Sequence, residues 1–528
     1  MCVSSQLKLL SVAAFFNALS WIILIPIWQY PDEQAHFAQV QDVAELGSVP
    51  KMPPDTSLEI ALSEEILGTT RDEFGNNKFT YHPEYKLTYA PGFSGPQESA
   101  IASLPKSART QLVKREATLN PPLYYFVGAF SYKLFYGSSL SSRVYAARFV
   151  SAIFFLTTIA LSYQIGSLIF AKNKILPLVL VSLVAFKPMM VFASTGVLPD
   201  TLTNFLFTLI LFFSLKILSS GLTILRLLGL IVVLILGILT RQQFIIAIPI
   251  VSLPIVYQLI KNWRRINRPI LMILSLVVLV IFWSFFVPQL AQVRSRILAE
   301  MNQPNLILIF NPKFLEHIGW TINHSIAEVL PWYWGVYKWL SLTVPHINYQ
   351  VINRIIALAL LGLIIRFFLI FKNKRFTNQD LILLFMIFAS AFYFLVFLIW
   401  DYFFRLRYGY SFGIQGRYFF PLVVAHLSIL LMGLFQIFEV IFKRYAKLAT
   451  LMIVFLMIIF NDVSLAHVSS SYYDTSSFTT FVNQASQYKP VLFKGNIILA
   501  ILLSTFILQS LFLLNLAKYI SAVAKKRT

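Results

Sequence analysis

Long runs of apolar residues, separated by short polar or basic segments, dominate the pattern along this chain. Uncharged runs as long as the roughly 20 residues that a helix needs to cross a bilayer lie at 9–31, 149–171, 269–293, 381–400 and 495–517. Backbone groups in hydrocarbon must be hydrogen-bonded within their own segment, so these runs predict helices. The pattern predicts an all-α polytopic membrane protein.

The remaining apolar segments bring the expected number of spans to about twelve, by the length that a spanning helix needs. They are expected to start near residues 8, 144, 175, 200, 223, 243, 269, 351, 379, 418, 447 and 496. Basic residues gather between them, and such clusters favour the cytoplasmic side. Both chain termini are then expected to be cytoplasmic. The clusters are Lys172/Lys174, Lys261/Arg264/Arg265/Arg268, Lys372/Lys374/Arg375, Lys443/Arg444/Lys447 and Lys525/Lys526/Arg527.

One apolar segment, residues 121–136, does not fit this alternation. It is short and opens with two prolines, and a crossing there would place Lys172 and Lys174 outside. The sequence therefore predicts an interfacial or re-entrant helix on the outer face.

The organisation is that of a single membrane domain over residues 1–528, with elaborated outer loops. These loops are expected at 29–143, 289–350, 401–417 and 466–494. The first loop holds 13 of the 22 acidic residues of the chain. Its pattern predicts short amphipathic helices at 33–46 and 57–67.

The amino-acid composition supports a membrane protein and argues against a soluble domain, a nucleic-acid-binding protein and a cysteine-rich protein. Hydrophobic residues make up 58% of the chain and charged residues 12%, against roughly 25% charged in a soluble domain. The net charge of +21 comes largely from clusters at helix ends, which are a topology signal and not a nucleic-acid surface. The single cysteine, Cys2, excludes an internal disulfide and a cysteine-rich metal site.

The first candidate chemistry lies directly after the first span, where Asp32 and Glu33 follow Pro31 and precede His36. One carboxylate can act as a general base while the other orients it or binds a metal. The alternative is an ordinary helix start, where proline and acidic side chains are both common.

Two further ionisable residues flank or interrupt apolar segments. Asp200, after Pro199, either caps a helix or joins Asp32 on the same face. No cofactor is certain, but a divalent cation (Mg²⁺ or Mn²⁺), if one is used, would be held by Asp32 and Asp200. Lys187 lies inside an apolar span, which favours a functional role, with snorkelling toward the headgroups as the alternative.

Three arginines are expected on the outer face, against the usual charge bias: Arg405, Arg407 and Arg417, the last followed by Tyr418. The guanidinium fork matches phosphate oxygens, so these residues are candidate phosphate ligands. Pairing with lipid headgroups or with Asp401 is the alternative. The aromatic stretch at 331–339 fits an interfacial belt better than a sugar platform.

Several of these motifs, in this order, resemble elements of bacterial membrane glycosyltransferases of the GT-C superfamily, and of a related, mostly uncharacterised bacterial family. The matching segments are 31–37 (PDEQAHF), 120–125 (NPPLYY), 148–152 (RFVSA), 199–200 (PD) and 415–418 (QGRY). The chain departs from the pattern at Asn120, where some aminoarabinose and mannosyl transferases of this type carry a basic residue.

The resemblance implies a sugar donor carried on a polyprenyl phosphate, reached from the outer face of a bacterial plasma membrane. Asp32 would take the proton of the acceptor, which attacks the sugar with inversion, while Glu33 and His36 orient the base. Arg417, Arg405 or Arg407, with Lys187, would stabilise the departing phosphate. The acceptor (a glycan, a lipid or a protein) stays open.

Two other classes of protein compete with this interpretation. A transporter or flippase would use the arginines as a substrate path and the acids as a proton relay. The acids lie mainly in an outer loop, however, and the sequence shows no half-to-half repeat of the kind that many transporters have. An assembly protein or polymer ligase could use the arginines but has no need of the early Asp-Glu pair.

Overall fold

The computed structural model confirms the all-α class. It describes residues 3–48, 55–70, 96–114, 119–262, 270, 311–441 and 443–525. Within these ranges the strands form two short antiparallel pairs: β1 (Thr56–Ser57) with β2 (Leu112–Val113), and β3 (Val336–Tyr337) with β4 (Leu342–Thr343). The rest of the regular structure is helical.

Nine helices in the described ranges are long and apolar enough to cross a membrane. They are α1 (Val3–Leu24), α7 (Leu140–Ile169), α10 (Asp200–Ser220), α12 (Ala247–Lys261, continuing η3 at Gln242–Ile246), α17 (His346–Asn373), α18 (Asn378–Tyr408), α19 (Val423–Val440, continuing η7 at Gly416–Leu422), α20 (Ala446–Tyr472) and α22 (Ile497–Lys525).

Two further apolar units complete the comparison with the predicted spans. The helices α8 (Leu176–Phe186) and α9 (Pro188–Thr195) meet at a 55° bend and together form a tenth candidate, while α11 (Ile224–Ile238) is apolar but shorter. All of the predicted starts therefore lie at or near observed helices, except the one near residue 269, which falls outside the described residues.

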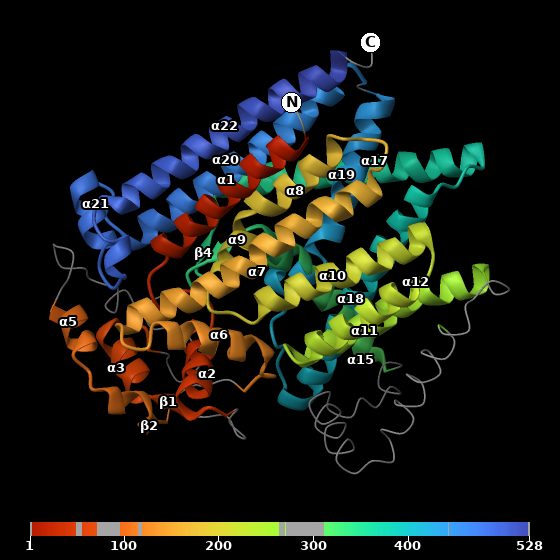
Figure 1. Ribbon diagram of the computed structural model, residues 1–528. Coiled ribbons are helices and arrows are strands. Elements are labelled where there is room, and N and C mark those ends of the chain that lie inside the picture. The colour runs from red at the N-terminus through yellow and green to blue at the C-terminus, as the bar shows by residue number, and fades with distance from the viewer. Residues whose placement is uncertain are drawn as a thin grey trace.

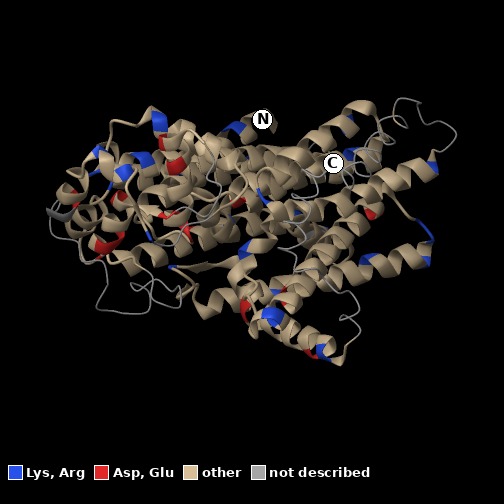
Figure 2. Ribbon diagram, turned by 90° about the horizontal axis from the view of Figure 1, so that it is seen from below, with Lys and Arg blue, Asp and Glu red and all other residues tan. Residues whose placement is uncertain are grey.

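The ends of the long helices lie on two opposite sides of the molecule. In Figure 1, α1 begins and α7 and α22 end on the same side of the molecule, away from α2 (Glu33–Leu46) and α3 (Leu58–Ile66). Figure 2 shows charged residues gathered toward the end that holds these short helices, with largely uncharged ribbon between that end and the opposite helix tips. A charged end on an apolar bundle fits a multi-pass membrane protein.

The predicted amphipathic helices of the first loop are confirmed. The helix α2 has the predicted bounds and ends at Gly47, which takes a left-handed conformation (φ 68°). The helix α3 is capped by Ser57, whose hydroxyl accepts from the Ile60 amide at 3.3 Å. Both signals, a glycine after the helix and a serine before it, are readable from sequence.

The segment predicted to lie at the interface forms α6 (Leu123–Leu134), a helix of 12 residues. At about 1.5 Å per residue it is far shorter than the roughly 30 Å hydrocarbon core. It packs against α2 and α7 and leaves Phe126, Phe130 and Leu134 exposed by 49%, 67% and 67%. One packed face and one exposed apolar face are what an interfacial helix presents.

Shorter elements complete the fold. They are α5 (Pro96–Ala102), η2 (Lys106–Arg109), α15 (Pro312–His324), the π-helical turn η6 (Ser325–Val329), α16 (Leu330–Trp334), η8 (Lys443–Tyr445), α21 (Phe478–Ala485) and η9 (Val491–Phe493).

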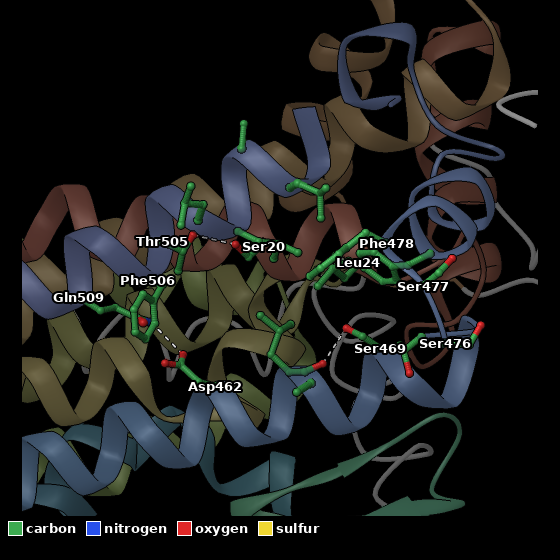
Figure 3. A pocket seen from close by; sticks show the side chains of 18 residues that line it. Ser20, Leu24, Asp462, Ser469, Ser476, Ser477, Phe478, Thr505, Phe506 and Gln509 are labelled. Carbon is green, nitrogen blue, oxygen red and sulfur yellow. Dashed lines mark hydrogen bonds between the residues drawn. The ribbon is translucent and has the colours of Figure 1, made fainter. Parts of the chain in front are cut away.

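A cavity of about 810 Å³ lies between α1, α20, α22 and the start of α21 (Figure 3). Its wall is largely apolar. Asp462 lines it and accepts from Asn461 and Gln509, at 3.0 and 3.1 Å.

The helices α17 and α19 cross in backbone contact. A Cβ added to Gly433 would collide with the carbonyl of Ala359, and one added to Gly362 with the carbonyl of Gly433. Small residues at such crossings let membrane helices approach closely. The pair therefore fixes α19, which continues the short η7 helix.

We expect Gly433→Val to lower the thermal unfolding temperature by several degrees, because overpacking at a site without room typically costs about 1–3 kcal/mol. Thermal unfolding of the purified protein in detergent measures the change. Gly319→Ala is the control, since a Cβ added at that position would meet nothing within 4 Å. An unchanged unfolding temperature for Gly433→Val would contradict the close crossing.

Candidate active site

Asp32 has an unusual backbone conformation at the start of α2. Its φ and ψ are 57° and 15°, in the left-handed region, and its side chain makes no capping hydrogen bond to α2. Non-glycine residues rarely adopt this conformation, and it concentrates at functional sites. The carboxylate instead contacts Arg417, with 3.2 Å between Oδ2 and Nη2. The geometry is therefore not that of an ordinary helix cap.

Arg417 reaches Asp32 from η7, 385 residues further along the chain. Its Nε donates to Gln415 Oε1 at 2.9 Å, and its guanidinium lies 5.6 Å from the centre of the Tyr418 ring. A Cβ on Gly416 would collide with the backbone of Tyr333. The neighbours of Arg417 in the QGRY element each support it. Gln415 orients the guanidinium, Gly416 allows close packing against Tyr333, and the ring of Tyr418 packs beside the arginine.

Asp200 and Arg241 form a second pair next to the first. Asp200 opens α10, and its Oδ1 lies 2.8 Å from Nη2 of Arg241, at the junction of α11 and η3. Tyr418 is within electrostatic range of both pairs. We call Asp32, Asp200, Arg241 and Arg417 the charge quartet. Its formal charges sum to zero.

His36 lies beside the quartet and is buried. Burial is the main cause that lowers its pKa to about 4. Arg241 and Arg417 lower it further, while Asp32 and Asp200 raise it. The imidazole is therefore neutral at neutral pH. Its Nδ1 lies 2.8 Å from the hydroxyl of Tyr125, which comes from the NPPLYY segment.

Glu33 has a different environment from Asp32. It is fully buried, and its two oxygens accept from Nε and Nη2 of Arg148, both at 2.7 Å. They also accept from the amides of Trp28 and Val197, at 3.0 and 3.3 Å. A carboxylate engaged on both oxygens cannot readily reach a substrate. This geometry favours the expected role of Glu33 in orienting the base over a direct catalytic role.

Lys187 is held where the chain breaks between α8 and α9. Its Nζ donates to the carbonyl of Tyr333 and lies 3.9, 4.7 and 4.8 Å from the ring centres of Tyr333, Trp334 and Phe420. An aromatic cage of this kind stabilises a cation. Neither phosphate binding nor snorkelling describes this lysine, which instead anchors α16 against the QGRY segment.

The other predicted phosphate ligands lie at the exposed end of α18. The guanidinium of Arg405 lies over the ring of Trp320 at 5.8 Å, and that of Arg407 over Tyr408 at 5.3 Å. Asp401, their proposed alternative partner, accepts instead from Ser411 Oγ and Phe412 N. The structure thus brings together Asp32, His36, Asp200, Arg417 and Tyr418, but does not group Arg405 or Arg407 with them.

Sequence reasoning missed Arg241. One signal was present: it lies at the outer end of two consecutive predicted spans, where a basic residue is unexpected. Arg143 and Arg148, near the start of α7, were also not recognised as partners of the loop carboxylates, because their positions do not identify those partners.

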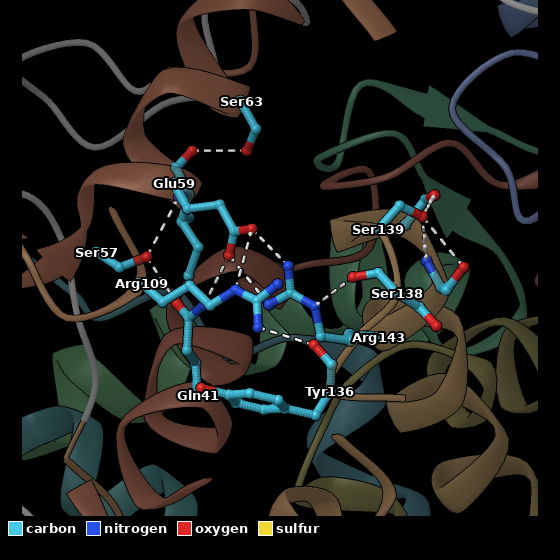
Figure 4. A network of polar contacts seen from close by, with 12 residues as sticks. Gln41, Ser57, Glu59, Ser63, Arg109, Tyr136, Ser138, Ser139 and Arg143 are labelled. Carbon is cyan, nitrogen blue, oxygen red and sulfur yellow. Dashed lines mark hydrogen bonds and ion pairs between the residues drawn. The ribbon is translucent and has the colours of Figure 1, made fainter. Parts of the chain in front are cut away.

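A second polar network holds the loop helices (Figure 4). Glu59 of α3 accepts from Arg143 of α7 at 2.5 and 3.0 Å and lies 3.7 Å from Nε of Arg109. Gln41 of α2 donates to the same carboxylate at 2.8 Å and accepts from Ser57 at 2.6 Å. The network ties α2 and α3 to α7 and so fixes the helix that carries Asp32 and His36.

The described residues contain no group of three or more His, Cys, Asp and Glu side chains placed to hold a metal ion. Asp32 and Asp200, the two residues expected to hold a divalent cation if one is used, each pair with an arginine.

The fold and the site define a polytopic membrane protein with a polar cluster at one end of its helices. Residues 15–426 match the family profile described as "Predicted membrane protein (DUF2142)", and the chain belongs to this family. The predicted relation to a mostly uncharacterised membrane family is thereby confirmed. No curated protein matches the sequence.

The chain also matches solved structures at low sequence identity. One is the oligosaccharyltransferase AglB of Archaeoglobus fulgidus, in complex with an inhibitory peptide and a dolichol-phosphate. It has 14% identity and a TM-score of 0.44, with 88% of this chain and 56% of that chain covered. This chain thus spans little more than half of that enzyme.

Another is ArnT of Cupriavidus metallidurans bound to undecaprenyl phosphate. It has 12% identity and a TM-score of 0.39, with coverage of 99% and 78%.

We expect Glu33→Gln and Arg148→Met each to destabilise the protein strongly, because removing one partner of a buried pair costs about 3–5 kcal/mol. The double variant should lose less than the sum of the single variants. Thermal unfolding and the yield of monodisperse protein measure this, with Glu328→Gln, whose side chain is 49% exposed, as the control. Additive losses would contradict a coupled pair.

Proposed function

We propose that this protein is a membrane glycosyltransferase that moves a sugar from a polyprenyl-phosphate donor to an acceptor hydroxyl. The contact between Asp32 and Arg417 carries the proposal. It joins a candidate base to a candidate phosphate ligand. The segment that holds Asp32 resembles GT-C glycosyltransferases, and the segment that holds Arg417 resembles the related, mostly uncharacterised bacterial family. Asp32 would then remove the proton of the acceptor, and the adjacent Arg417 would stabilise the departing phosphate.

The reaction needs three events. The acceptor oxygen forms a bond to the anomeric carbon, the bond from that carbon to the phosphate oxygen breaks, and the acceptor proton passes to Asp32. The sugar configuration inverts. Lipid phosphate is a stable anion, so the departing group needs positive charge nearby more than a proton.

The Asp32–Arg417 pair suits this sequence because charge moves across it. When Asp32 takes the proton it becomes neutral and loses most of its attraction for Arg417. At the same time the phosphate gains a negative charge. Arg417 can therefore turn from the carboxylate to the phosphate without being left unpaired, which would be costly in a site that is only 8% exposed at the arginine side chain.

Neutral His36 and Tyr125 would position the acceptor or Asp32 by hydrogen bonds, since a neutral imidazole both donates and accepts. The basic residues at the helix ends opposite the site favour a cytoplasmic position there. The quartet would then face outward, at the headgroup level of a bacterial plasma membrane. The sugar and the class of acceptor (glycan, lipid or protein) are left open by this chemistry, as is a divalent cation at Asp32 and Asp200.

We expect Asp32→Asn to lower transfer by at least about 100-fold, the usual scale for a lost general base. Asparagine keeps a side-chain oxygen that can accept from Arg417, and the side chain at this position is 32% exposed, so the protein level and unfolding temperature should change little. Transfer from radiolabelled polyprenyl-phosphate sugars to membrane acceptors is the measurement. Asp55→Asn, at an exposed position of the same loop, is the control. Turnover near the wild-type rate would remove Asp32 from the mechanism.

Arg417→Lys keeps the charge but cannot reproduce a fork that binds two oxygens. Loss of a charge-assisted contact costs roughly 1.5–3 kcal/mol, so we expect donor use to fall about 10-fold to 100-fold, and further in Arg417→Ala. Donor titrations on both variants separate this role from that of a simple headgroup anchor. Full donor affinity and rate in the lysine variant would show that bidentate phosphate recognition by Arg417 is wrong.

A further inference from the structure

Arg241 carries a donor that nothing in the described part of the protein accepts. Its Nε is buried and has no hydrogen-bond partner there, although Nη2 pairs with Asp200 at 2.8 Å. Buried guanidinium donors are rarely left without an acceptor, and such an atom in a native structure calls for an explanation. Nε and Nη2 lie on one edge of the guanidinium, the edge that binds two oxygens of a phosphate or carboxylate together.

The position of Arg241 connects this edge to the candidate active site. Its charge acts on His36 and on Tyr418, as do the charges of Asp32, Asp200 and Arg417. The side chains of Arg241 and Asp200 are 21% and 25% exposed. An anion can therefore approach this pair from solvent, and the ion pair can open at modest cost because partly exposed pairs are weak.

We propose that Arg241 is a second phosphate ligand, which takes over the polyprenyl monophosphate as it leaves the sugar. This inference rests on the proposed function and names the product-binding part of the same site. In the resting protein Asp200 occupies part of the phosphate position on Arg241. The departing phosphate displaces it and also meets Nε.

The charges of donor and product explain why two arginines are needed. The donor is a phosphodiester with one negative charge, whereas a phosphate monoester carries about 1.5–2 negative charges at neutral pH. Arg417 alone matches the donor. When the bond to the sugar breaks, its electron pair stays on the phosphate oxygen and the acceptor proton is on Asp32. The additional charge on phosphate is then matched by Arg241.

Binding measurements test this without relying on turnover. The probes are farnesyl monophosphate (a monoester), farnesyl methyl phosphate (a diester) and inorganic phosphate, titrated by calorimetry into the full-length protein in detergent. We expect Arg241→Gln to weaken the monoester by about 10-fold or more, the scale of a charge-assisted contact, and the diester by much less. Arg417→Gln should weaken both.

Asp200→Asn gives an effect of opposite sign. Without its carboxylate competitor Arg241 should bind the monoester more tightly than in the wild type, whereas a purely structural Asp200–Arg241 pair predicts unchanged or weaker binding in both variants. The Asp200→Asn variant also keeps the test valid if Arg241→Gln folds poorly. Arg354→Gln, an exposed arginine of α17, should change neither affinity.

The outcomes separate the inference from the proposed function. Equal weakening of monoester and diester by Arg241→Gln, or no weakening, would overturn the role of Arg241 while transfer by the wild type still supports the glycosyltransferase. Unchanged or weaker monoester binding in Asp200→Asn would overturn the displacement of Asp200. Inorganic phosphate bound as tightly as farnesyl monophosphate would assign the position to free phosphate. A wild-type protein that binds neither farnesyl compound and transfers no sugar would instead remove the proposed function.

Discussion

The buried ion pair of Glu33 and Arg148 is the constraint on which the geometry of the site depends. Arg148 uses all five of its N–H donors: two on Glu33 and three on the carbonyls of Ile22, Ile25 and Pro26. These carbonyls lie in and just past the last turn of α1, where a helix leaves such groups without partners. One side chain of α7 thus ends α1 and starts α2. Two charges buried without water are tolerable only with such complete hydrogen bonding.

This arrangement explains how a strained residue is kept in place. Asp32 adjoins Glu33, so the turn that gives it a positive φ is clamped from one side by Arg148. From the other side, Gln41 and Glu59 fasten α2 to Arg143 of the same α7 helix. Functional groups need positions fixed to a fraction of an ångström, and rigid helices with a supporting polar shell provide this. The loop helices therefore hold Asp32 and His36 in fixed positions.

Sequence patterns predicted what local chemistry determines. The bounds of α2 were readable because acidic residues open it and Gly47 closes it, and Asp32, Asp200 and Arg417 were selected because each interrupts or ends an apolar run. The partners of Glu33, Lys187 and Arg241 were not readable. These partners lie 115, 146 and 41 positions away, counted to Arg148, Tyr333 and Asp200. Helix packing decides that Glu33, and not the adjacent Asp32, is buried against Arg148. The periodicity of the sequence does not encode this packing.

Burial also decides which carboxylate–arginine pairs can take part in chemistry. Glu33–Arg148 is completely excluded from solvent, so opening it would leave two buried charges unmatched, and no ligand can reach it. Asp32 and Asp200 are 32% and 25% exposed, and each is joined to its arginine through a single Nη2 contact. Such a partly exposed pair can open when an incoming anion replaces the carboxylate on the arginine, because no charge is then left unmatched. The same two side-chain types therefore serve as a permanent clamp in one place and as an exchangeable phosphate position in the other, and the difference lies in how much water reaches them.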